Sequence, residues 1–416
     1  MELELVTIGT ELLLGFTLDT NGAEIGRALA AQGIRLARRT SVPDRADDIR
    51  EAVGAALRRT GAVLTTGGLG PTHDDVTKQT VAGLFGTPVV FDEALWQALL
   101  ERYARYRRTP TANNRSQAEI PQGAVVLPNR WGSAPGLWLE GAAGLAIMLP
   151  GVPGEMRNLL HHEVLPRLSE RTSAAVGVIR SGTVRTTGIA ESALAERLGD
   201  IEARLAPLTL AYLPGVTSVD LRVTAWHLPA AEAEARVSEA LGLLEAGAGE
   251  FAYGRGDTDL AAVLLAEARR RGCRIGVAES CTGGLVGGRI TAVPGSSDVF
   301  VGGIIAYADE IKREVLGVGA ATIGAHGAVS EPVAVEMAHG AAARLGADVT
   351  VAVTGIAGPD GGTAEKPVGL VCFGFHVRGH QDSMQRVLFG DREEIRARAS
   401  QLALFEVYRR LRSLPD

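Results

Sequence analysis

Lysine, cysteine and long hydrophobic runs are scarce in this chain of 416 residues. All but three of its 42 basic residues are arginines, and the exceptions are Lys78, Lys312 and Lys366. A guanidinium group cannot give up its proton, whereas a buried ammonium group can, so each lysine is a candidate for proton transfer. Asparagine is also scarce, which is typical of a high-temperature or compositionally biased source.

The cysteines argue against two kinds of covalent framework. Cys273, Cys281 and Cys372 are odd in number and lack Cys-x-x-Cys spacing, so neither a disulfide scaffold nor a structural zinc site is expected. No apolar run is long enough to cross a bilayer, and the first residues lack the basic region and cleavage pattern of a signal peptide. We therefore expect a cytoplasmic protein without a membrane partner.

The charge balance is mildly acidic, with a net charge of −6 and no basic stripe. This argues against nucleic acid as a partner and favours small ligands or other proteins. One hydrophobic core is not enough for a chain of this length, so two or three domains are expected. We predict an α/β multidomain protein with domains at 1–170, 171–253 and 254–416.

The first predicted domain alternates strands with helices. The segments at 3–8, 34–41, 62–65 and 145–149 are predicted to be strands, and amphipathic helical segments lie between them. This alternation predicts a parallel, doubly wound sheet.

A glycine-rich loop, 66–77, follows the third of these strands. Its glycines, among them Gly68, let backbone N–H groups approach an anion, and the next helix N-terminus favours negative charge. The paired carboxylates of Asp74 and Asp75 could hold a hard divalent cation against a phosphate. The alternative is that both aspartates complement the dipole of the following helix.

Four of the five asparagines lie in or near loops of this domain, at Asn21, Asn113, Asn114 and Asn129. Each one by itself is explained as a turn former. Their gathering around apparent strand ends is better explained by a polar ligand pocket.

The middle of the chain has a different pattern of predicted strands and helices. Strands at 208–213 and 219–226, between helices at 190–205 and 230–246, predict a small α+β module of KH-like size. It has no Gly-x-x-Gly clamp with basic neighbours, so we expect a spacer or dimerisation role rather than RNA binding.

The segment 278–284 of the last domain reads Ala-Glu-Ser-Cys-Thr-Gly-Gly. A strand at 274–278 feeding a helix at 282–293 places Ser280 at the carboxyl edge of a sheet, beside free backbone N–H groups. Such a place suits a nucleophile, with the N–H groups of 282–284 as an oxyanion hole. The alternative is that Ser280 or Thr282 only caps the helix.

A serine nucleophile needs a base. A Ser-His-Asp triad is not favoured, because no motif surrounds the histidines of this region. These are His326, His339, His376 and His380. A desolvated, neutral Lys312 is the more economical base. Tyr307 could relay the proton or orient the substrate, or it could close a strand over the core. Cys281 is a rival nucleophile unless it points into the core.

Six short motifs stand out along the chain. They are Gly9–Leu13, Thr65–Asp75, Leu149–Met156, Ala278–Gly284, Tyr307–Lys312 and Thr354–Pro359 followed by Lys366–Gly369. Together they resemble the competence/damage-inducible protein A (CinA) family over essentially the whole chain. The first three resemble the half of that family that is related to molybdopterin-binding domains.

For the C-terminal domain the resemblance implies a nicotinamide-nucleotide amidohydrolase without a cofactor. It would convert nicotinamide mononucleotide to nicotinate mononucleotide and ammonia. Ser280 would be the nucleophile and Lys312 the base, assisted by Tyr307 and Thr354. The residues that would bind the substrate are Thr282, Gly283, Gly284, Gly355 and, at its phosphate, Arg392.

For the N-terminal domain the resemblance implies an ADP-ribose pyrophosphatase in a homodimer. It would use a divalent ion (Mg²⁺, Mn²⁺ or Co²⁺), with a monovalent cation as an optional second ion. Asp74 and Asp75 would hold the metal, and Lys78 is either a phosphate contact or a surface lysine. The residues that would bind the substrate are Glu11, Asn21, Gly68 and Thr72.

Three hypotheses therefore compete. The first is a bifunctional enzyme of pyridine-nucleotide salvage. The second is a deamidase whose N-terminal half is a non-catalytic module for nucleotide binding or dimerisation. The third, recruitment to DNA during competence, is disfavoured by the acidic charge balance.

Overall fold

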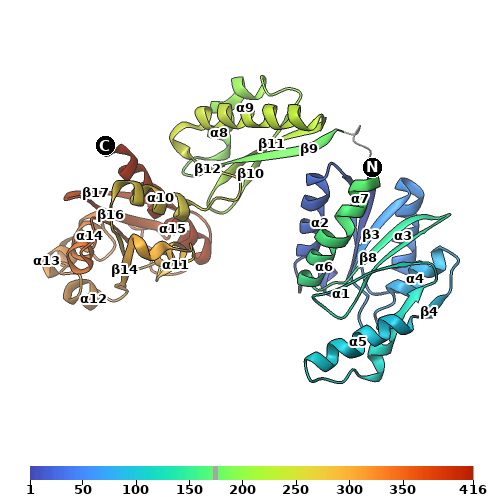
Figure 1. Ribbon diagram of the computed structural model, residues 1–416. Coiled ribbons are helices and arrows are strands. Elements are labelled where there is room, and N and C mark those ends of the chain that lie inside the picture. The colour runs from blue at the N-terminus through green and yellow to red at the C-terminus, as the bar shows by residue number, and fades with distance from the viewer. Residues whose placement is uncertain (172–176, 416) are drawn as a thin grey trace. The chain divides into compact units, whose positions relative to one another are not determined.

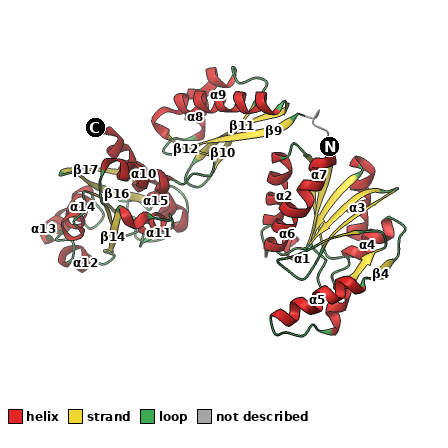
Figure 2. Ribbon diagram, in the orientation of Figure 1, coloured by secondary structure: helices red, strands yellow, loops and turns green. Residues whose placement is uncertain are grey.

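The computed structural model describes residues 1–171 and 177–415 (Figure 1). The chain divides into two compact units, one of 1–180 with 225–235 and the other of 181–224 with 236–416. Helices and strands alternate in both (Figure 2), as the predicted α/β class requires. The predicted boundary after residue 253 lies inside the second unit, and the domain boundaries stay predictions.

The first unit contains a six-stranded sheet of order β2-β1-β3-β8-β7-β6. Strands β2, β1, β3 and β8 are parallel, whereas β7 and β6 are antiparallel additions at one edge. In sheet order the strands are Arg35–Val42, Glu2–Ile8, Ala62–Thr66, Gly144–Leu149, Gly136–Gly141 and Val125–Leu127.

Helices cover both faces of this sheet, which confirms the predicted doubly wound architecture (Figure 1). Successive side chains of a strand point to opposite faces, so Leu3 and Leu5 of β1 pack in one core and Val6 and Ile8 in the other. Helices α2, α6 and α7, with the π-helix η2, cover the first face, and α3 and α4 cover the second. Their bounds are Thr20–Ala31, Pro153–Leu159, Leu165–Arg171 and Leu160–Val164, then Ala46–Thr60 and Thr77–Leu84.

Five short elements lie outside this sandwich, namely α1, α5, η1 and the ribbon β4-β5. Their bounds are Thr10–Leu13, Glu93–Arg105, Ala112–Ala118, Val89–Phe91 and Glu119–Pro121. The segment that contains η1 was expected to be a turn. It forms a 3₁₀ helix because Thr111 and Asn114 cap it reciprocally, with the Asn114 amide oxygen accepting from the Thr111 N–H.

The KH-like module is a four-stranded sheet of order β10-β11-β9-β12 with two helices. Its elements are β9 (Val178–Thr186), α8 (Glu191–Glu202), β10 (Thr209–Pro214), β11 (Val219–Leu228), α9 (Ala230–Ala248), η3 (Gly249–Phe251) and β12 (Ala252–Arg255).

The C-terminal domain has a five-stranded sheet of order β14-β13-β15-β16-β17, parallel in its first three strands and antiparallel in the rest. In sheet order the strands are Phe300–Ile305, Ile275–Glu279, Val349–Gly355, Leu370–Val377 and His380–Val387. The helices are α10 (Leu260–Arg271), α11 (Leu285–Thr291), η4 (Ser296–Asp298), α12 (Asp309–Glu314), α13 (Ala320–His326), α14 (Glu331–Leu345) and α15 (Arg392–Ser413).

The two faces of this sheet again have separate cores. Helices α10, α11 and α15 pack on Val277 and Val351, and α14 packs on Ala278 and Ala352 of the same strands. The carboxyl ends of β13, β14 and β15 therefore meet at one edge, with helices on either side. Among the described residues no helix is long and apolar enough to cross a membrane.

Candidate functional site

A cavity of about 220 Å³ lies at the carboxyl ends of β13, β14 and β15. It brings together side chains that are far apart in the sequence, including Ser280 after β13, Tyr307 after β14 and Thr354 on β15. The lining residues are Ser280, Cys281, Tyr307, Asp309, Lys312, Ala328, Val329, Thr354, Gly355, Ala357 and Arg392. The four residues predicted to be catalytic thus share one cavity.

Lys312 is 2% exposed, and its ammonium group has two partners. It donates to the carboxylate of Asp309 at 2.9 Å and to the backbone oxygen of Tyr307 at 3.1 Å. The burial expected for this lysine is observed, and the structure adds a carboxylate partner that the sequence analysis did not predict. Asp309 lies three residues before Lys312 on α12, a spacing that could have revealed the pair.

Tyr307 and Arg392 form the open side of the cavity. Tyr307 is 62% exposed, so the interpretation that it closes a strand over the core is wrong. Arg392 donates to the Tyr307 hydroxyl at 3.2 Å and to the backbone oxygen of Gly358 at 2.6 Å. It is the first residue of the 22-residue helix α15, whose N-terminus is capped by the carboxylate of Asp391.

A loop before α14 forms another wall. The hydroxyl of Thr354 donates to the backbone oxygen of Ala328 at 2.9 Å. Lys366 donates to the backbone oxygens of His326 and Val329 at 2.6 and 2.7 Å, so this lysine anchors the wall. The cavity lining contains no histidine, in keeping with the expectation that no Ser-His-Asp triad operates here.

The turn after β13 differs from the prediction. The Glu279 carboxylate, 1% exposed, accepts from the N–H groups of Gly284, Val286 and Gly287 at 2.8–3.1 Å. These are the orphan donors at the start of α11, and the two oxygens of one carboxyl group satisfy them together. The helix consequently begins at Leu285 rather than at residue 282.

This arrangement occupies two of the three N–H groups of the predicted oxyanion hole. The N–H of Gly284 is bound to Glu279, and the N–H of Gly283 donates to the backbone oxygen of Ser280 at 3.0 Å. Thr282 does not cap α11, and its buried hydroxyl has no hydrogen-bond partner among the described residues. None of these three residues lines the cavity, in contrast to Gly355.

Cys281 is a poor rival to Ser280. Burial raises the pKa of its thiol to about 12, so the reactive thiolate is scarce near neutral pH. Its backbone oxygen, like that of Thr282, accepts a hydrogen bond from Arg396 of α15. The turn that carries Ser280 is therefore fastened to the same helix that carries Arg392.

In the first unit the glycine loop folds back on itself. Gly67 has a φ of 111°, and a Cβ there would lie 2.1 Å from the backbone oxygen of Ile8, so only glycine fits. The Asp75 carboxylate accepts from the N–H groups of Gly70 and Thr72 at 2.7 and 2.8 Å and from the Thr72 hydroxyl. Asp75 and Thr72 thus stabilise the loop.

The glycine loop fits a divalent cation only if a bound phosphate supplies part of its ligands. Asp74 is exposed and next to Asp75, but the described residues contain no group of three His, Cys, Asp or Glu side chains placed to hold a metal. An all-protein cage is therefore not present among them. Mg²⁺ is usually held by one or two carboxylates plus substrate phosphates, and a cation that arrives with a phosphate is compatible with Asp74.

The other two predicted N-terminal residues lie elsewhere. Glu11 and Asn21 line a small cavity of about 100 Å³ that contains neither Gly68 nor Asp74. The Asn21 amide donates to the Thr66 hydroxyl at 3.1 Å, and its buried amide oxygen has no partner among the described residues. The structure therefore does not gather the predicted N-terminal residues in one cavity.

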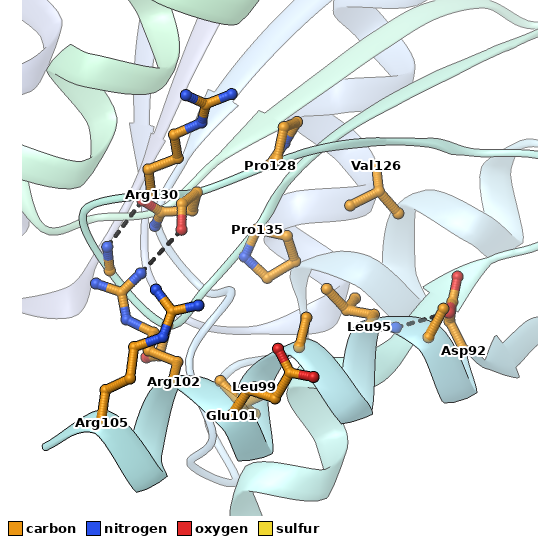
Figure 3. Close-up of a pocket in the computed structure, with 15 residues that line it drawn as sticks. Asp92, Leu95, Leu99, Glu101, Arg102, Arg105, Val126, Pro128, Arg130 and Pro135 are labelled. Carbon is orange, nitrogen blue, oxygen red and sulfur yellow. Dashed lines mark hydrogen bonds between the residues drawn. The ribbon is translucent and has the colours of Figure 1, made fainter.

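A larger cavity of about 580 Å³ lies between α5 and residues 126–135 (Figure 3). Asn129 lines it, and Figure 3 shows Arg102, Arg105 and Arg130 gathered at one end, where an anion would be attracted. Sequence analysis missed these arginines because nothing in their spacing separates them from other surface arginines. Asn114 does not line this cavity and instead bonds to Tyr103 and Gln117, so the predicted asparagine pocket is divided.

Lys78 is neither a phosphate contact nor a surface lysine. It is 2% exposed and donates to the backbone oxygen of Ser116, which fastens η1 to α4. Burial lowers the pKa of Lys78 to about 8.

Comparison with known proteins matches three family models to successive parts of the chain. These are the probable molybdopterin binding domain over 4–170, the damage-inducible protein CinA KH domain over 181–254 and the CinA C-terminal domain over 257–411. A CinA-like protein of Gemmatimonas aurantiaca is 52% identical over 406 residues, which cover 97% of this chain and 95% of the relative. The chain belongs to the CinA family.

Two further proteins with CinA-type names are similar to this chain. A putative competence-damage inducible protein of Symbiobacterium thermophilum is 43% identical over 418 residues, 98% of each chain. A crystal structure of a CinA superfamily protein from Klebsiella pneumoniae is 34% identical and covers 37% of this chain and 97% of its own, with a TM-score of 0.37. The cavity with Ser280 lies wholly inside the span of the CinA C-terminal domain.

Proposed function

We propose that the C-terminal domain hydrolyses the amide of nicotinamide mononucleotide to nicotinate mononucleotide and ammonia. The observation that carries this proposal is that Ser280 and Lys312 line one cavity with Arg392 at its open side. A hydroxyl nucleophile, a buried amine and a cation for a phosphate are the groups that amide hydrolysis on a mononucleotide requires.

Ser280 attacks the amide carbon, and its hydroxyl proton passes to Lys312. The tetrahedral intermediate collapses when the lysine returns this proton to the departing nitrogen, which leaves as ammonia. Water then hydrolyses the acyl ester with the same lysine as base, and Ser280 is regenerated. Lys312 has to be neutral to accept the serine proton. Asp309 pairs with Lys312, and because its side chain is 47% exposed, it gives a proton released by the lysine a path to solvent.

Arg392 binds the phosphate, since its guanidinium presents positive charge at the open side of the cavity. Tyr307, held by Arg392 through its hydroxyl, is exposed there and offers a ring face to the pyridine.

The test is ammonia release from nicotinamide mononucleotide by the wild type and Ser280→Ala. We expect loss of at least about 10³-fold in Ser280→Ala. A matched control is Ser383→Ala, on β17 of the same domain and outside the cavity, which keeps the wild-type rate. Full activity in a folded Ser280→Ala variant contradicts the mechanism, and no ammonia from the wild type contradicts the substrate.

We propose that the N-terminal domain hydrolyses the diphosphate of ADP-ribose in the presence of a divalent cation. The support is the glycine loop next to an exposed Asp74, and three arginines at one end of a cavity in the same unit. Asp74 would hold Mg²⁺, Mn²⁺ or Co²⁺ together with the diphosphate, and the ion would neutralise phosphate charge.

A second candidate function for this half is a non-catalytic nucleotide-binding or dimerisation module, which the loop contacts of Asp75 favour. The test uses full-length Ser280→Ala with ADP-ribose and each cation in turn. Formation of AMP and ribose 5-phosphate supports the hydrolase. Binding of ADP-ribose without products supports the module, and light scattering tests the proposed homodimer.

A further inference from the structure

A cavity of about 540 Å³ in the second unit belongs to neither proposed reaction. One wall comes from the KH-like module, through 187–191 and the hairpin turn 214–219. The other wall comes from the C-terminal domain, through 386–389 and the helix α15. We call this space the junction cavity.

The N-terminus of α8 opens into the junction cavity. Its N-cap is Ala190, which has no side-chain group to accept from the first N–H groups, and Ala190 and Glu191 both line the space. Uncapped N–H groups at the start of a 12-residue helix carry partial positive charge and are donors without acceptors. Glu191 adds one negative charge, but it is exposed on the first turn.

Two polar side chains of α15 line the same space. Gln401 is 4% exposed and lies one turn of the helix from Arg398. The Nε of Arg398 is buried and lacks a hydrogen-bond partner in the described structure. Buried polar groups are nearly always hydrogen-bonded, so this Nε points to a missing ligand, and the Gln401 amide is placed to bind the same ligand.

The remaining lining mixes polar side chains (Thr187, Thr217, Ser218 and Arg386) with apolar ones and includes an aromatic ring. The guanidinium of Arg398 lies 3.8 Å from the centre of the Phe389 ring, and Phe389 is 73% exposed. Val387 and Val216 beside it are 62% and 44% exposed. Exposed apolar side chains next to a flat ring suit a flat heterocycle, because stacking removes both surfaces from water.

We propose that the junction cavity binds a mononucleotide. Its phosphate lies on the N-terminus of α8 beside Arg398, its base lies against Phe389, and the Gln401 amide bonds to a polar edge of the base. This site is separate from the Ser280 cavity, which lies at the first turn of α15 and contains Arg392 instead.

The experiment is hydrogen–deuterium exchange of the full chain, read by mass spectrometry, with AMP and separately with inorganic phosphate. We expect AMP to slow exchange at 191–193 and at 386–389, and phosphate to slow it at 191–193 only. Because the readout is local, AMP bound elsewhere in the chain is distinguished from AMP in the junction cavity. No slowing at either segment with saturating AMP overturns the proposal, and identical patterns with both probes reduce it to a plain anion site and overturn the mononucleotide.

Substitutions in α15 test which side chains contribute to AMP binding. Arg398→Met and Gln401→Leu each keep side-chain volume, and we expect each to weaken AMP protection at these segments by about 10-fold, the value of one or two hydrogen bonds to a charged or buried group. Arg412→Met is the matched control, since Arg412 lies on the same helix over the Tyr408 ring at 5.6 Å and does not line the cavity. Equal weakening in Arg398→Met and Arg412→Met overturns the assignment.

Discussion

The predicted site residues share one cavity in the C-terminal α/β domain but not in the N-terminal one. In the C-terminal domain Ser280, Tyr307, Lys312 and Thr354 converge on one cavity. In the N-terminal domain the predicted residues are divided between a small cavity with Glu11 and a loop that folds on itself. Ser280, Tyr307 and Thr354 lie on or directly after adjacent parallel strands, whereas Glu11 and Asn21 lie on helices α1 and α2 and the other predicted N-terminal residues lie on the loop after β3.

In each of the two domains a carboxylate accepts hydrogen bonds from backbone N–H groups of its own loop. Glu279 accepts from three N–H groups at the start of α11, and Asp75 accepts from Gly70 and Thr72 in the glycine loop. Both carboxylates lie near strand ends, where catalytic or metal-binding groups are usual. The comparison teaches that an acidic residue at such a place has to be checked first for backbone donors in its own loop.

The largest expected effect is the loss of ammonia release in Lys312→Arg, with the exchange of the other buried lysine, Lys78, as its control. Lys312→Arg keeps the charge and removes the proton shuttle, so ammonia release falls by about 10³-fold. Lys78→Arg changes the buried lysine of the other domain and leaves ammonia release per folded molecule unchanged. Both rates are measured with nicotinamide mononucleotide, and an active Lys312→Arg variant refutes the Ser–Lys mechanism.

Two aspartate variants separate metal binding from loop stability in the N-terminal domain. Asp74→Asn raises the Mg²⁺ concentration for half-maximal ADP-ribose hydrolysis by about 10- to 100-fold, the usual range for a lost contact at a metal site. Asp75→Asn weakens three loop hydrogen bonds and lowers the unfolding temperature instead. Metal titration and thermal unfolding of the same preparations check this, and indistinguishable variants contradict the division of roles.

Lys78→Met tests the buried charge of the first unit. Burial lowers the pKa of Lys78 from 10.5 to about 8, so between these values the unfolded chain binds more protons and wild-type stability rises with pH. Methionine does not titrate, and its stability relative to lysine therefore falls by about 2 kcal/mol from pH 7.5 to pH 10.

Three of the four tryptophans, Trp96, Trp131 and Trp138, lie in the N-terminal domain, so tryptophan fluorescence during urea unfolding of the full chain reports mainly this domain. Lys312→Met, in the second unit, is the control and does not change the pH dependence of that transition. A stability difference between Lys78→Met and the wild type that is constant with pH shows that Lys78 keeps an ordinary pKa.

The smallest expected effect is that of Cys281→Ala. Because the pKa of this thiol is about 12, we expect ammonia release to stay within about 3-fold of the wild type. The thiol also resists iodoacetamide at pH 8 in the folded protein. Loss of activity comparable to that of Ser280→Ala would identify Cys281 as the nucleophile.

Much of the fold was predictable because hydrophobic periodicity reports it directly. The strands predicted at 62–65 and 145–149 are observed at Ala62–Thr66 and Gly144–Leu149, and the alternation of strands and helices predicted both faces of the first sheet. The predicted helix at 282–293 was too long at both ends, because periodicity does not show that Glu279 binds its first N–H groups. The ribbon β4-β5 was missed because its strands are only three residues long.

By itself the sequence determined that Ser280, Tyr307 and Thr354 meet at one sheet edge, because parallel strands end at the same side of a sheet and these residues end three such strands. Only the tertiary structure decided which hydrogen bonds those groups make. It paired Lys312 with Asp309, bound the N–H of Gly284 to the Glu279 carboxylate and, among the described residues, left the Nε of Arg398 without a partner. The physical reason is that hydrogen bonds and ion pairs depend on distances of about 3 Å between atoms, which a one-dimensional pattern does not contain.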